Sequence, residues 1–289
     1  MSAQFKVNFI GIGSGKCGST WLYDNLVKHP QICDSNLKEL NYFSDLYEEH
    51  PPSWYAGQYA SCSGELLKGE FSVTYLAHPL AAARIKNDFP DARLLAIVRD
   101  PVQRTFSNYL HSQRKGDIKP DLTFEAYIRS AVNLAPARYV EHFERWFETF
   151  PAEQIHVVVL EEFLRDQLSG YRDIYRFIGA SPIDFVPPGY DERSNEARSY
   201  RFLLIENVMV RTYRWLSRRG YTRLVKGVLD SGVGTLVRKL NGSDAPPPRI
   251  DEASREYLEG YFRPFNQRLS DLLKRDLSCW EQRREMSRE

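Results

Sequence analysis

The sequence predicts an α/β fold in which helices cover both faces of a central parallel sheet, giving a three-layer sandwich. Three short apolar runs, rich in Val, Ile and Leu, have the length of buried strands, and they begin at Phe5, Ala92 and Gln154. Helix-like sequence follows each run. Strands that are buried on both faces and alternate with helices are typical of parallel sheets.

The first strand, Phe5–Ile12, leads into a glycine-rich turn and then into a helix. Apolar side chains recur at helical spacing between Trp21 and Val27, and Pro30 ends the pattern. The order of strand, glycine-rich turn and helix is that of a P-loop.

The second strand stops at Pro101, and a helical pattern follows over residues 102–114. The third strand is β-branched, and a short helix after it is expected to end near Gly170. A further helix is expected over residues 171–180. These elements, without an internal repeat or a low-complexity linker, predict a single domain over residues 1–289.

Composition excludes several classes of protein. The chain of 289 residues has 39 Lys and Arg against 38 Asp and Glu, so the net charge of +1 creates no general attraction for nucleic acid. No apolar run approaches the roughly 20 residues of a membrane-spanning helix. The chain is therefore expected to be soluble and cytoplasmic, with no nucleic-acid partner and no integral membrane segment.

The cysteines give a separate expectation. They are scattered without a CxxC pair, at positions 17, 33, 62 and 279. This spacing argues against a zinc site and against a disulfide framework.

One segment differs from the rest in charge. Residues 193–240 contain eleven Lys and Arg but three acidic residues. Such a segment suits an anionic ligand or surface, and the alternative is a helix with solvated arginines and an apolar face toward the core.

The turn 13–20, GSGKCGST, carries the strongest chemical signal. Backbone N–H groups at the start of a helix bind anions, Lys16 adds a cation, and Ser19 and Thr20 add hydroxyl donors. The turn departs from a Walker loop, because Ile10 replaces the first glycine and Cys17 replaces the magnesium-binding hydroxyl. A plain strand-to-helix turn is the alternative.

A second candidate anion site follows the second strand. Arg99 offers two parallel donors, and Ser107 offers a hydroxyl from the next helix. Together these residues suit a phosphate group.

These two motifs resemble those of sulfotransferases that use 3′-phosphoadenosine 5′-phosphosulfate (PAPS). The resemblance implies that Arg99 and Ser107 bind the 3′-phosphate, without a metal ion. Arg198 and Ser199 fall where relatives have a basic loop that closes over the cofactor. The residues implied for the 5′-phosphosulfate are Gly15, Lys16, Cys17, Gly18, Ser19, Thr20 and Trp21.

Further blocks resemble the Golgi-type carbohydrate sulfotransferases and their bacterial relatives. In the block KELNYF, 38–43, the resemblance makes Glu39 the general base and gives Lys38 a lesser role. Lys16 would neutralise the leaving phosphate. His111 is a weaker candidate for the base, and Cys17 is interpreted as a small spacer. The remaining matching blocks are 69–75, 139–146 and 268–280.

The acceptor stays open: a hydroxyl of a sugar, a lipid, a small molecule or a carrier-tethered intermediate fits equally. Asn41 and Phe71 replace a His and a Lys of the heparan-type enzymes, which argues against a heavily sulfated polymer. Two other functions also stay open. One is a P-loop kinase that uses Mg-ATP, and the other is a non-catalytic protein that binds nucleotides or membrane surfaces.

Overall fold

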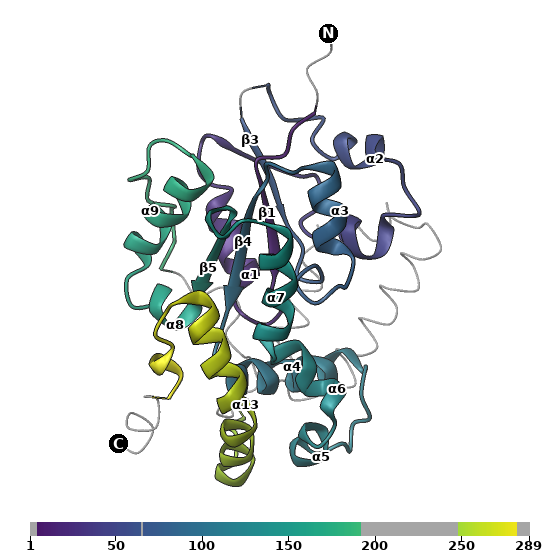
Figure 1. Ribbon diagram of the computed structural model, residues 1–289, viewed down its shortest axis with the longest axis vertical. Helices are drawn as coiled ribbons and strands as arrows, with labels where there is room; N and C mark the ends of the chain where they lie inside the picture. Colours follow the sequence, from purple (N-terminus) through teal and green to yellow (C-terminus); the bar gives the residue numbers. More distant parts are fainter. Residues whose placement is uncertain (1–4, 65, 192–247, 282–289) are drawn as a thin grey trace, which may run out of the picture.

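The computed structural model describes residues 5–64, 66–191 and 248–281, and a five-stranded parallel sheet forms their centre (Figure 1). The strands lie in the order β2-β3-β1-β4-β5, and every neighbouring pair is parallel. Their bounds are β1 Phe9–Gly13, β2 Ile32–Asp34, β3 Leu67–Phe71, β4 Arg93–Val98 and β5 Ile155–Val159.

Helices cover both faces of this sheet, as predicted. The longer ones are α1 Ser19–Leu26, α3 Ala81–Asp88, α4 Pro101–Lys115, α7 Tyr139–Thr149, α9 Gln167–Ile178 and α13 Glu252–Leu273. Figure 1 shows α3 and α7 in front of the sheet. The shorter helical segments are η1 Tyr42–Leu46, α2 Pro52–Gly57, α5 Phe124–Ile128, α6 Ala131–Leu134, η2 Ala135–Ala137, η3 Ala152–Gln154, α8 Leu160–Phe163 and η4 Ser278–Trp280.

The chain leaves β1 and β4 in opposite directions across the sheet. After β1 it runs through α1 to β2 at one edge, and after β4 it runs through α4 to α7 to β5 at the other edge. Such a divergence opens a crevice beyond the carboxyl ends of the two strands, where ligands of open α/β sheets bind. The backbone N–H of Ser14 donates to the carbonyl of Ile97 at 2.7 Å and extends the contact between these strands into the crevice.

Aromatic rings lie over glycines where β1 pairs with β3. Phe9 is opposite Gly69, and Gly11 is opposite Phe71. A Cβ atom on Gly69 would lie 2.2 Å from Cε1 of Phe9, and one on Gly11 would lie 2.1 Å from Cδ2 of Phe71. Both rings are fully buried, so the two glycines are required by close packing.

The sequence did not predict β2 and β3. The strand β2 has three residues at a sheet edge, and β3 contains Lys68, Gly69 and Glu70, so neither has the apolar run of a buried strand. The expected helix end at Gly170 is also wrong. Gly170 lies within α9, where a Cβ atom would meet the ring of Phe163 at 2.4 Å.

The expectation against a disulfide is corrected by a bond between Cys33 and Cys62. The two Cα atoms are 5.8 Å apart although 29 positions separate the residues in the sequence. Pairing of β2 with β3 and the turn after α2 bring them together, which spacing alone does not reveal. The remaining cysteines, Cys17 and Cys279, are buried and free.

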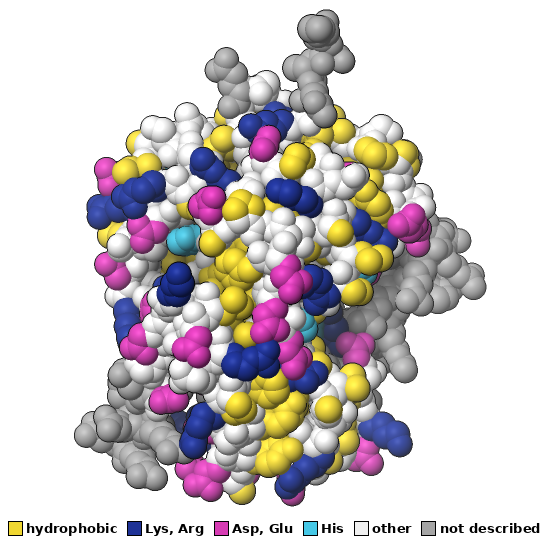
Figure 2. Space-filling view, viewed as in Figure 1, with side chains coloured by type: hydrophobic (Ala, Val, Ile, Leu, Met, Phe, Trp, Pro, Cys, Tyr) yellow, Lys and Arg dark blue, Asp and Glu magenta, His cyan; other side chains and the backbone are white. Residues whose placement is uncertain are grey.

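Charges of both signs are interspersed on the face shown in Figure 2, in keeping with the small net charge of the chain. Among the helices of the described residues, none combines the length and the hydropathy that crossing a bilayer requires.

Gly69→Ala tests the packing of the ring of Phe9. The added methyl overlaps a fully buried ring, so we expect a loss of about 1–3 kcal/mol in the free energy of unfolding, measured by urea denaturation. Gly260→Ala is the control. Gly260 is exposed on α13, and a Cβ atom there would meet nothing within 4 Å. An unchanged midpoint for Gly69→Ala would contradict this packing.

Candidate active site

The glycine-rich turn forms a left-handed loop between β1 and α1. Lys16 and Gly18 have φ angles of 69° and 86°, and Gly18 precedes the first residue of α1 without a side-chain cap. The N–H groups of the first helical turn have no acceptor within the helix. The loop therefore has the backbone donors and the helix dipole that bind an anion.

Tyr139 of α7 joins this loop to the end of β4. Its hydroxyl lies 3.4 Å from Sγ of Cys17 and donates to the carbonyl of Arg99 at 3.0 Å. Cys17 is fully buried, and burial raises the pKa of its thiol. The buried thiol of Cys17 thus favours the neutral form over a thiolate.

The motif of Arg99 and Ser107 spans the junction between β4 and α4. Asp100 caps α4 by accepting from the N–H of Val102 at 2.9 Å, and Pro101 occupies the first helical position. Arg99 and Ser107 are both half-buried. The contacts of Tyr139 with Cys17 and with the carbonyl of Arg99 place the end of β4 beside the glycine-rich turn, but neither Arg99 nor Ser107 lines the cavity described below.

Arg104 is a site residue that the sequence analysis missed. Its side chain on α4 is 5% exposed, and its Nε donates to the carbonyl of Gly15 at 3.3 Å. Its Nη1 is buried without a hydrogen-bond partner. Arg104 precedes Ser107 by three positions, so the two share a helix face, and this spacing is the signal that the sequence offered.

A cavity of about 240 Å³ adjoins the loop beside Lys16. One wall is apolar, and its residues are Val73, Leu76, Ala77 and Pro136. The other wall is polar, and its residues are Ser14, Gly15, Lys16, Arg104, Asn108, His111 and His142. Burial lowers the pKa of His142, and its Nε2 lies 3.1 Å from the carbonyl of Ala135. His111, the weaker candidate for the general base, also lines the cavity.

Positive charge is concentrated around Lys16. Burial lowers the pKa of its ammonium to about 8. Three cations add to this effect, namely Arg114, Lys115 and Arg104. A bound anion would relieve both the repulsion and the unpaired buried donor of Arg104, so these residues fit a phosphate or sulfate group.

Glu39 lies outside the walls of this cavity. It is exposed on the segment that follows β2, and its neighbour Lys38 is half-buried. Burial lowers the pKa of Lys38, against the opposing effects of Asp24 and Glu39. The structure thus places the predicted base on a separate segment from the loop and the arginines.

Some predicted residues lie outside the described parts of the chain. These are Arg198 and Ser199, together with the basic segment 193–240. Within the described residues, no group of three or more His, Cys, Asp and Glu side chains is arranged to hold a metal ion.

Comparison with known proteins identifies the family. Residues 8–186 match the family described as "Sulfotransferase domain". The chain belongs to the sulfotransferase family. Membership confirms the family and the class of enzyme that the sequence predicts, and the sheet confirms the predicted α/β fold.

Relatives and a solved structure agree with this assignment. A sulfotransferase from Alicyclobacillus acidocaldarius superposes with a TM-score of 0.69 at 26% identity, covering 96% of this chain and all of that one. The human bifunctional heparan sulfate N-deacetylase/N-sulfotransferase 3 is 27% identical over 92% of this chain and 29% of its own length. The membrane-associated sulfotransferase kil1 of Dictyostelium discoideum is 36% identical over 50% of this chain and 31% of its own. This chain therefore spans about a third of these curated relatives.

The pKa of Lys16 predicts how anion binding depends on pH. An anion favours the charged ammonium, whose pKa is about 8 before binding. We expect the affinity for 3′-phosphoadenosine 5′-phosphate to fall about tenfold between pH 7 and pH 9 in calorimetric titrations. Lys16→Arg keeps its charge over this range, so its affinity should not vary with pH. An equal decline in both proteins would contradict the prediction.

Proposed function

We propose that this chain transfers a sulfuryl group from PAPS to an acceptor hydroxyl. The observation that carries the proposal is the position of two anion-binding elements at the diverging ends of β1 and β4. Tyr139 and Arg104 link these elements. PAPS has anionic groups at both ends of its ribose. A crevice with two anion-binding elements therefore suits PAPS better than it suits a ligand with a single anionic group.

The donor side combines the loop, Lys16 and the arginines. Residues 15–21 bind the 5′-phosphosulfate through backbone N–H groups and hydroxyls, and Lys16 neutralises the charge that grows on the leaving phosphate. Arg99 and Ser107 bind the 3′-phosphate. Arg198 and Ser199 are assigned to a loop that closes over the donor.

The acceptor side depends on Glu39. Its carboxylate accepts the hydroxyl proton while the new O–S bond forms and the bond between sulfur and the phosphate oxygen breaks. The proton stays on Glu39, and 3′-phosphoadenosine 5′-phosphate leaves. Lys38, beside Glu39, contacts the acceptor or the leaving group.

The acceptor class is a hydroxyl compound, such as a sugar, a lipid, a small molecule or a carrier-tethered intermediate. The apolar wall of the cavity favours an acceptor with an uncharged part. The names of several relatives include N-sulfotransferase, so an amino sugar is the alternative that an acceptor screen must include.

The single domain over residues 1–289, the Golgi-type and bacterial relationship and the cytoplasmic location stay predictions. The Cys33–Cys62 disulfide weighs against the cytoplasm, because such bonds persist mainly in oxidising compartments.

Arg99→Ala tests the donor. Losing a charged hydrogen-bonding partner costs about 1.5–3 kcal/mol, so we expect affinity for 3′-phosphoadenosine 5′-phosphate to weaken about 10- to 100-fold in calorimetric titrations. AMP, which lacks the 3′-phosphate, should bind weakly to both proteins. Arg176→Ala removes an equal charge from an exposed site on α9 and serves as the control. Preference of the wild type for Mg-ATP would support a kinase instead.

Glu39→Gln tests the base. We expect kcat for sulfuryl transfer to fall about 10²- to 10⁴-fold, because proton transfer is lost, while the affinity for 3′-phosphoadenosine 5′-phosphate is unchanged. Radiolabelled PAPS is presented to sugar, phenol, lipid and amino-sugar acceptors. The matched control is Glu49→Gln, an exposed carboxylate on the same segment. Full activity of Glu39→Gln would contradict the assignment, and His111→Ala would then be the next variant.

A further inference from the structure

Glu70 is a carboxyl group with no exposure to solvent, near the end of β3. Its Oε1 accepts from the hydroxyls of Tyr55 at 3.0 Å and Tyr75 at 2.8 Å. Its Oε2 accepts from the hydroxyl of Ser72 at 2.5 Å. None of the proposed catalytic steps uses this residue.

Two of these hydroxyls also accept from the segment that follows Glu39. The N–H of Asn41 donates to Ser72 Oγ at 3.0 Å, and the N–H of Phe43 donates to the hydroxyl of Tyr75 at 3.4 Å. The backbone of residues 41–43 is therefore bound to one buried carboxyl through two hydroxyls.

The turn in this segment needs such support. Asn41 has a φ of 51°, in the left-handed region that residues with a Cβ seldom adopt. Such a conformation is unfavourable and persists where surrounding contacts hold it. The bond from Asn41 to Ser72 acts at this turn, two positions after Glu39.

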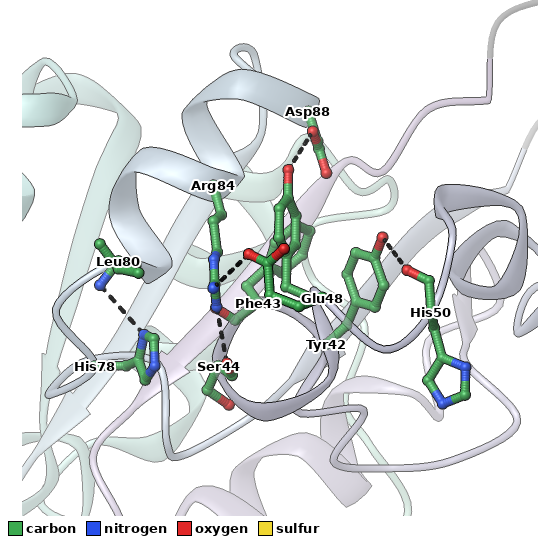
Figure 3. A network of polar contacts seen from close by, with 10 residues as sticks. Tyr42, Phe43, Ser44, Glu48, His50, His78, Leu80, Arg84 and Asp88 are labelled. Carbon is green, nitrogen blue, oxygen red and sulfur yellow. Dashed lines mark hydrogen bonds and ion pairs between the residues drawn. The ribbon is translucent and has the colours of Figure 1, made fainter.

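Arg84 of α3 holds the same segment through its carbonyl groups (Figure 3). Its Nη1 donates to the carbonyls of Phe43 at 3.0 Å and Ser44 at 2.8 Å, and its Nη2 pairs with Glu48 at 3.0 Å. The N–H groups of the segment thus bond toward Glu70, and its carbonyls bond toward α3.

We propose that Glu70 is a positioning residue, which fixes the backbone of residues 41–43 through Ser72 and Tyr75 and thereby the carboxylate of Glu39 for proton transfer. This inference rests on the proposed role of Glu39. Glu70 itself does not touch the acceptor, because it is fully buried beneath the segment.

An ionised carboxylate suits this role better than an amide. All three hydroxyl partners donate, and a carboxylate has acceptor sites for each, whereas an amide nitrogen would face donors. The titratable groups that face Glu70 are phenols, with pKa values raised by burial; they are Tyr23, Tyr55, Tyr59 and Tyr75.

Burial raises the pKa of Glu70 to about 7, against the lowering effect of its hydrogen bonds. Above that pH the carboxylate accepts all three bonds. Below it the added proton competes with a donor, so the segment is held less firmly.

The test compares Glu70→Gln and Ser72→Ala with Tyr55→Phe. Tyr55→Phe removes a hydroxyl that donates to Glu70 and not to residues 38–44, and it keeps the ring, so it is the matched control. We expect Glu70→Gln and Ser72→Ala to lower kcat about 10- to 100-fold, since misplacement of a reacting group has effects of this size. Their affinity for 3′-phosphoadenosine 5′-phosphate should stay within about twofold of wild type, and Tyr55→Phe should keep its kcat.

Two further measurements separate positioning from general stability. Hydrogen–deuterium exchange of residues 38–44 should quicken in Glu70→Gln and Ser72→Ala but not in Tyr55→Phe. The kcat of the wild-type protein should fall as the pH drops through about 7, and this fall in kcat should be smaller in Glu70→Gln.

The proposal is overturned if Glu70→Gln and Ser72→Ala keep wild-type exchange in residues 38–44. It is also overturned if Tyr55→Phe lowers kcat as much as Ser72→Ala, because Glu70 would then only stabilise the core. Failure of the proposed base appears separately, as full activity of Glu39→Gln.

Discussion

The parallel pairing of β1 with β4 is the constraint on which the whole site depends. After these two strands the chain turns toward opposite edges of the sheet, so the connections do not cover the carboxyl ends of β1 and β4. The bond from Ser14 to Ile97 continues the pairing into the loop. Backbone hydrogen bonds therefore place the two anion-binding elements, and their side chains are left to bind the ligand. A fold of this kind tolerates changes in the site that it would not tolerate in the strands.

The site brings positive groups together at an electrostatic cost before any ligand binds. Burial and the neighbouring cations lower the pKa of Lys16, and Arg104 has a buried donor without an acceptor. The carbonyl of Gly15 holds Arg104, and Tyr139 joins the turn at Cys17 to the end of β4. An arrangement fixed in advance needs no reorganisation when negative charge develops on a leaving group.

Local patterns predicted the parts of the molecule that depend on neighbours in sequence. The apolar runs of β1, β4 and β5 and the motif at 13–20 belong to this group. The strands β2 and β3 were missed because one is short and the other carries Lys68 and Glu70. Tyr139 was part of a matching block, yet its role could not be predicted, since its partner Cys17 is 122 positions away. The contact of Arg104 with Gly15 spans 89 positions and the disulfide spans 29, so these too lie beyond local patterns.

The disulfide gives the acceptor side of the site an unusual topology. Cys33 and Cys62 close a covalent ring that contains Lys38, Glu39, the turn at Asn41 and all of α2. Closing a ring of 29 positions restricts the unfolded chain by about 3–4 kcal/mol in the chain-entropy view. A single break in the backbone inside the ring would leave both fragments attached. The segment that carries the proposed base therefore stays tethered to the sheet at both ends, even when its hydrogen bonds open.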